Sequence, residues 1–282
     1  MAGEFEQRID DETVAREGAP GTHPEFDALV RTIWRLRQPD GCPWDKAQTH
    51  QSFSRCLIEE SYEALEATRT GDDEALCEEM GDVLEQVLLH AQIGADEGSF
   101  DIDDVCRGLN QKLVRRHPHV FGEAGGVGTA DEVLDLWDKV KATEREAASD
   151  GGEEPGLLDS IPTSMPALMQ CQKISKRAAK QGFEWETTAD VWQKVAEERA
   201  EFEAEEAGSA AAAEEFGDLL FALVNVARKE GIDAEAALEA SNAKFRRRWA
   251  AVEALARAEG ARVDELSTER LNELWDQVKA AE

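Results

Sequence analysis

Two short acidic stretches decide how we expect this chain to fold: EESYE at residues 59–63 and EEMGD at residues 78–82. Residues three or four apart lie on one face of an α-helix. The pairs Glu60 with Glu63, and Glu79 with Asp82, therefore belong on two consecutive helices. If these helices pack antiparallel, four carboxylates converge, and such a group needs protons or a cation to neutralise it. Ligands that are all oxygen, with no His or Cys, favour a hard cation, Mg²⁺ or alternatively Mn²⁺.

The same arrangement recurs in the second half of the chain, as EERAE at residues 197–201 and EEFGD at residues 214–218. The spacing is similar in the two copies: Glu63 precedes Glu79 by 16 residues, and Glu201 precedes Glu215 by 14. With 61 acidic residues among 282, a single such motif would be weak, since most glutamates are expected on solvated helix faces. The ordered recurrence instead predicts a duplicated module. The second ligand set is Glu198, Glu201, Glu215 and Asp218.

Composition restricts the class of protein and of partner. The formal net charge is −30, and so acidic a surface repels nucleic acid and anionic membranes. We find no apolar run long enough to span a membrane and no signal peptide, and the five cysteines form no C-x-x-C pair, so we expect reduced thiols in a cytoplasmic protein. Ala, Leu, Glu and Arg dominate, which favours an all-α fold.

Breaker residues and apolar spacing divide the chain into a disordered tail (1–22), a first module (23–146), a linker (147–156) and a second module (157–282). Residues 37–45 are expected to form a loop rich in Pro and Gly. The predicted helices are 24–36, 49–70, 72–97, 101–117, a short one near 136–141, 166–181, 188–207, 210–230, 233–258 and 264–280.

A basic motif, N-x-K-x-x-R-R, follows the acidic helices in both copies, at residues 110–116 and 242–248. Such charges commonly balance nearby glutamates on a helix surface. We interpret them as an anion site, because Arg and Lys bind phosphate oxygens and both copies keep the motif. Trp137 and Trp275 are either core residues or side chains on which a nucleobase stacks. The expected phosphate-binding residues are Lys112, Arg115, Arg116, Lys244, Arg247 and Arg248.

Over roughly residues 24–282 these motifs, with GCPWD at 41–45, RHPHVFG at 116–122 and QKISKRAA at 172–179, resemble the MazG nucleoside triphosphate pyrophosphohydrolases. The resemblance implies tandem four-helix modules, usually in a homodimer. It also implies Mg²⁺-dependent hydrolysis of NTPs and dNTPs to the monophosphate and pyrophosphate.

The resemblance also assigns roles within the second copy. Lys194, one turn before Glu198, joins the basic residues as a phosphate contact, and Trp275 contacts the nucleotide, as Trp137 would in the first copy. Our own hypothesis for the mechanism adds Glu197, adjacent to Glu198, as a base or water-orienting group, and it counts the ligands Glu198 and Glu201 as catalytic.

Cys56 stands where the second copy has Lys194, so we expect the second copy to carry most of the activity. A di-iron bundle would require E-x-x-H, which neither acidic pair contains. The remaining alternative is a non-catalytic nucleotide-binding protein or a structural helical repeat.

Overall fold

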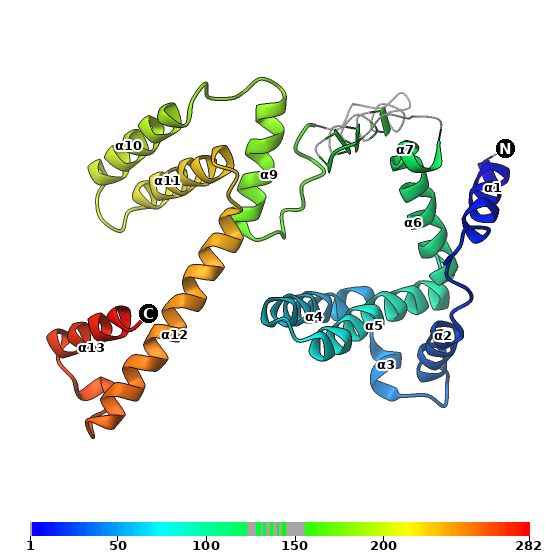
Figure 1. Ribbon diagram of the computed structural model, residues 1–282, viewed down its shortest axis with the longest axis horizontal. Helices are drawn as coiled ribbons and strands as arrows, with labels where there is room; N and C mark the ends of the chain where they lie inside the picture. The colour runs from blue at the N-terminus through cyan, green and yellow to red at the C-terminus, as the bar shows by residue number, and fades with distance from the viewer. Residues whose placement is uncertain are drawn as a thin grey trace. The chain divides into compact units, whose positions relative to one another are not determined.

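The computed structural model describes residues 2–122 and 156–282, and between them residues 128–130, 132, 133, 136, 137, 140, 143 and 144. Within this part of the chain every regular element is a helix, which confirms the all-α expectation (Figure 1). None of the described helices is long and apolar enough to cross a membrane. The helices are α1 (Ala2–Val14), α2 (Pro24–Leu36), α3 (Pro43–Ala47), α4 (His50–Thr70), α5 (Asp73–Glu97), α6 (Ile102–Arg116), α7 (Pro118–Phe121), α9 (Ala167–Lys180), α10 (Thr188–Ala204), α11 (Ala210–Lys229), α12 (Ala234–Ala258), the 3₁₀ turn η1 (Val263–Glu265) and α13 (Thr268–Ala280).

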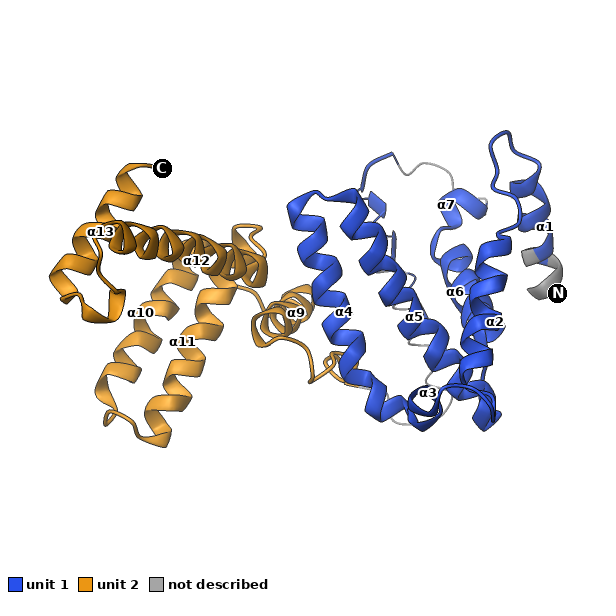
Figure 2. Ribbon diagram, turned by 90° about the horizontal axis from the view of Figure 1, so that it is seen from below, with its two compact units in different colours: residues 1–150 blue, residues 151–282 orange. Residues whose placement is uncertain are grey.

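The chain divides into two compact units, residues 1–150 and 151–282 (Figure 2). The expected linker at 147–156 lies outside the described residues, apart from Gly156. Much of the short helix expected near 136–141 lies outside them as well.

Unit 1 is organised around the antiparallel hairpin of α4 and α5. Thr49 caps α4 in a reciprocal capping box with Ser52, and Gly71 ends that helix in the left-handed conformation, with φ of 69°. Asp72 then caps α5 by accepting hydrogen bonds from two backbone N–H groups. Since only Gly71 and Asp72 separate the helices, α5 returns directly alongside α4.

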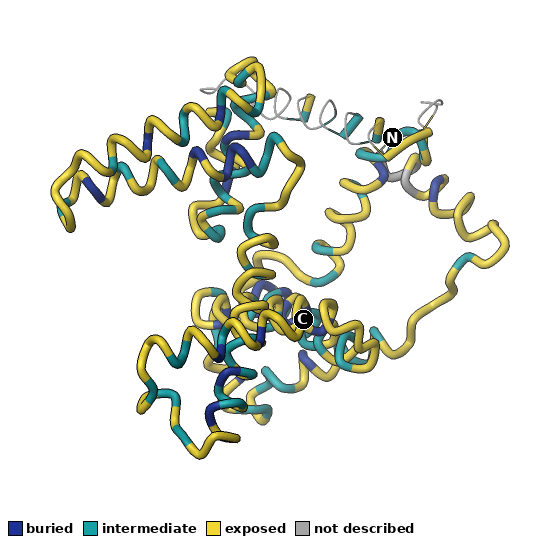
Figure 3. The backbone as a smooth tube through the Cα atoms, turned by 60° about the vertical axis from the view of Figure 1, so that its left-hand side comes forward, coloured by how far each residue is buried: buried dark blue, intermediate teal, exposed yellow. Residues whose placement is uncertain are grey.

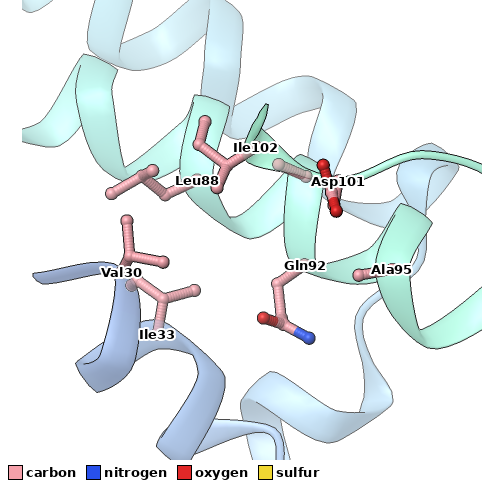
Figure 4. A pocket seen from close by; sticks show the side chains of 8 residues that line it. Val30, Ile33, Leu88, Gln92, Ala95, Asp101 and Ile102 are labelled. Carbon is pink, nitrogen blue, oxygen red and sulfur yellow. The ribbon is translucent and has the colours of Figure 1, made fainter. Parts of the chain in front are cut away.

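The core of unit 1 lies between this hairpin and α2. The end of the hairpin that holds the turn at Gly71 and Asp72 is exposed. The buried residues of the core are Ile33, Phe53, Leu88, Leu89 and Ile93. Complete burial of each such side chain contributes about 1.5–3 kcal/mol. A small pocket of about 50 Å³ remains where α2, α5 and the start of α6 meet, and it is lined mainly by apolar side chains together with Gln92 and Asp101 (Figure 4).

Unit 2 contains a second hairpin, α10 with α11. Thr187 forms a capping box with Asp190 at the start of α10, and Ser209 caps α11. The bend between them holds Gly208 with φ of 81°. The long helix α12 continues past this hairpin and packs against α13 around Val252 and Leu274, both fully buried.

Two segments differ from the sequence-based expectations. Residues 1–22, which were predicted to form a disordered tail, contain α1. This helix has an i,i+4 hydrogen bond between Gln7 and Asp11 and buries Ile9. The loop expected over 37–45 contains the start of α3, because Pro43 occupies the first helical turn, where its fixed φ suits a helix.

Candidate functional site

The hairpin of unit 1 brings three of its four predicted ligands together. Glu60 on α4 and Glu79 and Asp82 on α5 each offer a carboxylate oxygen, and these oxygens all lie within 4.8 Å of one another. Glu63 lies outside this trio, yet its charge contributes to raising the pKa of both glutamates. The i,i+3 spacing on two antiparallel helices thus produces the convergence expected of it.

The carboxylates of unit 1 are poorly compensated by protein groups. Burial, followed by the charge of Glu63, raises the pKa of Glu60 and of Glu79. Oxygen Oε2 of Glu79 is buried and has no hydrogen-bond partner. A buried oxygen without a partner among converging carboxylates fits a hard divalent cation, whose ligands are oxygen atoms.

The hairpin of unit 2 forms a similar group. Glu198, Glu201 and Glu215 each offer an oxygen within the same 4.8 Å limit. Burial raises the pKa of Glu215, with added repulsion from Glu201, Asp218 and Glu198. Asp218 is therefore an electrostatic neighbour of the trio without belonging to it.

A lysine distinguishes unit 2 from unit 1. The ammonium nitrogen Nζ of Lys194 lies 2.5 Å from Oε1 of Glu198 and 2.8 Å from Oε1 of Glu197. Hydrogen bonds to Glu197 and Glu198 raise the pKa of Lys194. The position corresponding to Lys194 in unit 1 is Cys56, which is partly buried and packs against the core.

The predicted phosphate-binding arginines pair with a glutamate in each unit. Glu282 accepts hydrogen bonds from Nε and Nη2 of Arg248, at 3.0 and 2.6 Å, and lies 3.6 Å from Arg247. Within residues 156–282, no ion pair or hydrogen bond joins Lys244, Arg247 or Arg248 to the acidic trio of that unit.

In unit 1, Glu144 accepts hydrogen bonds from both Arg115 and Arg116, and these arginines hold its pKa at about 2. Lys112 and Lys244 are exposed. In both units the arginines are thus held by a glutamate that is distant in the sequence.

The comparisons identify the family. A model described as the MazG nucleotide pyrophosphohydrolase domain matches residues 48–121, a range that contains the acidic hairpin of unit 1. The chain is 43% identical over 263 residues to a nucleoside triphosphate pyrophosphohydrolase of Escherichia coli K12, covering 92% of this chain and 98% of that protein. The chain belongs to the MazG family. This confirms the resemblance that the acidic motifs indicated.

Two further relatives extend the comparison. A MazG nucleoside triphosphate pyrophosphohydrolase/pyrophosphatase of Thermotoga maritima is 40% identical over 257 residues, covering 91% of this chain and 96% of that protein. The protein YabN of Bacillus subtilis is 48% identical over 263 residues, which cover 92% of this chain and 52% of the relative. Similarity to the MazG family therefore extends along most of the chain.

Both predicted nucleotide-binding tryptophans of this MazG chain have aromatic neighbours. Trp275 packs against the α12–α13 core. The centroids of the Trp275 and Phe245 rings are 5.1 Å apart, and the guanidinium carbon of Arg248 lies 5.8 Å from the centroid of the Trp275 ring. Trp137 lies edge-on to His117, with ring centroids 5.0 Å apart. Both tryptophans therefore contribute to packing within their own unit.

Three acidic residues that pair with or lie near the predicted site residues had no role predicted for them: Asp45, Glu144 and Glu282. Glu144 and Glu282 each follow the tryptophan of their unit by seven residues, in the shared pattern LWDxVKAxE, which was the available signal. Asp45 of the GCPWD stretch is 7% exposed, and its charge adds to the burial and the Asp82 repulsion that raise the pKa of Glu85. The acidic group of unit 1 therefore extends beyond its four predicted ligands.

The raised pKa of Glu79 leads to a prediction about pH. A carboxyl whose folded-state pKa lies above its unfolded value stabilises the fold at low pH, and this contribution is lost as pH rises. In metal-free buffer, Glu79→Gln should match the wild type near pH 4 and become progressively more stable than it toward pH 7. Urea unfolding at both pH values measures this. A variant that is less stable at pH 7 would contradict the description of this site.

Proposed function

We propose that this chain is a divalent-metal-dependent nucleoside triphosphate pyrophosphohydrolase, which cleaves between the α- and β-phosphates to give a monophosphate and pyrophosphate. The observation that carries the proposal is the convergence of carboxylate oxygens on each helical hairpin. The names of the full-length relatives support the same activity. They do not favour a non-catalytic nucleotide-binding protein or a structural repeat.

The residues of unit 2 then have distinct tasks. Glu198, Glu201, Glu215 and Asp218 hold Mg²⁺, for which Mn²⁺ would substitute. When bound, the ion supplies Lewis-acid polarisation of phosphate oxygens. Glu197, 58% exposed at its side chain, orients the attacking water and accepts its proton.

The basic residues serve the leaving group. Lys244, Arg247 and Arg248 share one face of α12, so they offset the charge that develops on departing pyrophosphate. Glu282 must release or share its two arginines when phosphate arrives, since a carboxylate and a phosphate compete for the same N–H donors. Trp275 contacts the nucleotide at the edge of this cluster.

We further propose that the two units are duplicated MazG modules and that the protein is a homodimer. The repeated LWDxVKAxE pattern and the matched arginine–glutamate pairs support duplication. Exposed apolar side chains on the hairpins, including Tyr62, Met80 and Phe216, support burial of these faces against a second copy. Figure 3 shows exposed residues along much of the helical backbone.

A nucleotide panel tests the activity and the nature of the substrate. The acidic surface argues for free nucleotides in the cytoplasm over nucleic acid or membrane as the partner. Incubation with NTPs and dNTPs plus Mg²⁺, followed by chromatography, should give monophosphate and pyrophosphate in equal amounts. Chelation by EDTA should abolish the products. Binding without turnover across the panel would instead support the non-catalytic alternative.

A further inference from the structure

We propose that the ammonium group of Lys194 occupies the acidic group of unit 2 in place of a metal ion. A metal ion then binds there only when a triphosphate has bound the lysine instead. Unit 1, with Cys56 in that position, would take metal without nucleotide. The inference rests on the proposed function, because it concerns the metal and phosphate of that same site. It makes the order of binding a property that differs between the two units.

The contacts of the lysine support this role. Glu198 is a member of the converging trio, its side chain is 8% exposed, and its oxygen lies 2.5 Å from the lysine ammonium group. A metal ion bound by the same carboxylate would come close to that ammonium, and two cations so near each other repel strongly away from bulk water. Lys194 and a metal ion therefore compete for Glu198 while the phosphate site is empty.

The ammonium group of Lys194 can also move from Glu198 to a phosphate group. The side chain of Lys194 is 37% exposed and carries its ammonium group on a flexible stem, so the ammonium can leave Glu198 without unfolding α10. A triphosphate provides anionic oxygens that replace the carboxylates as its partners. Metal and nucleotide are then expected to bind unit 2 together and each to strengthen the other.

Unit 1 provides the internal comparison. The position corresponding to Lys194 is occupied there by Cys56, which has no ammonium group and is partly buried against the core cluster of unit 1. The buried oxygen Oε2 of Glu79 lacks any hydrogen-bond partner. Among the described residues of unit 1, no ion pair joins a lysine or arginine to Glu60, Glu79 or Asp82, so a metal ion would have no such cation to displace there.

Binding of Mn²⁺ alone tests the proposal, read from the electron paramagnetic resonance signal of the free ion and without nucleotide. Unit 1 is first silenced in the full chain by Glu60→Gln with Asp82→Asn. In this background Lys194→Met should bind Mn²⁺ at least about tenfold more tightly than the parent, the scale on which one neighbouring charge acts. Lys194→Arg keeps the positive charge and should remain as weak as the parent. Helix content and urea midpoint confirm folding.

The reverse substitution keeps the test independent of that one variant. With unit 2 silenced by Glu215→Gln and Asp218→Asn, Cys56→Lys should weaken Mn²⁺ binding by unit 1. Equal affinities with Lys, Met and Arg at position 194, under saturable binding, would overturn the inference and leave the proposed function standing. Absence of saturable binding to unit 2 in every variant, with or without ATP, would overturn both.

Discussion

Replacing Glu201 with glutamine is expected to lower pyrophosphate release by at least about 100-fold, because changing even an outer partner of a metal ligand costs roughly 10–100-fold. Glu201 is an exposed residue of α10 and contributes an oxygen to the trio of unit 2. Glutamine is nearly as good a helix former, so the hairpin should fold normally. Initial rates over a Mg²⁺ titration measure the effect, with circular dichroism as the check on folding.

Glu203→Gln is the matched control for this variant. Glu203 lies on the same helix, and its partner is Arg199, one turn earlier. Exposed pairs of this kind contribute little to stability, so turnover and unfolding should stay close to the wild type. If Glu201→Gln retained full turnover at saturating Mg²⁺ while folded, Glu201 would not be a ligand.

Inactivating one unit at a time is expected to give unequal losses. Asp218→Asn should remove most of the activity, and Asp82→Asn should leave most of it, because Lys194 lies beside the carboxylates of unit 2 and Cys56 takes its place in unit 1. Both changes remove one charge at corresponding places in the two hairpins, so each serves as the other's control. Steady-state rates with a single NTP at saturating Mg²⁺ provide the comparison. The opposite ranking of the two variants would show that unit 1 is the principal catalyst.

The helices of the hairpins could be predicted because their signals are local. Gly71 and Asp72 mark the boundary between α4 and α5 in the sequence itself, and the spacing of Glu60 and Glu79 from it determines where their carboxylates meet. Such end signals and periodicities need no knowledge of tertiary structure. The α1 helix was missed because its apolar residues are few, so the charged composition suggested disorder.

The partners of the charged groups were harder to predict. The pairing of Arg248 with Glu282 joins residues 34 positions apart, and no local rule selects one glutamate among 61 acidic residues. The contact of Lys194 with Glu198 follows the i,i+4 rule, yet the resemblance assigned that lysine to phosphate. Sequence spacing identified the charged residues, whereas their mutual compensation depends on side-chain packing.

Hydrolysis in ¹⁸O-labelled water identifies the phosphorus atom that is attacked. The same carboxylates and basic cluster would also suit a phosphatase acting at the γ-phosphorus. We expect the label to appear in the nucleoside monophosphate, with one molecule of unlabelled pyrophosphate formed per turnover. Mass spectrometry of both products reads this out. Nucleoside diphosphate together with labelled orthophosphate would contradict it.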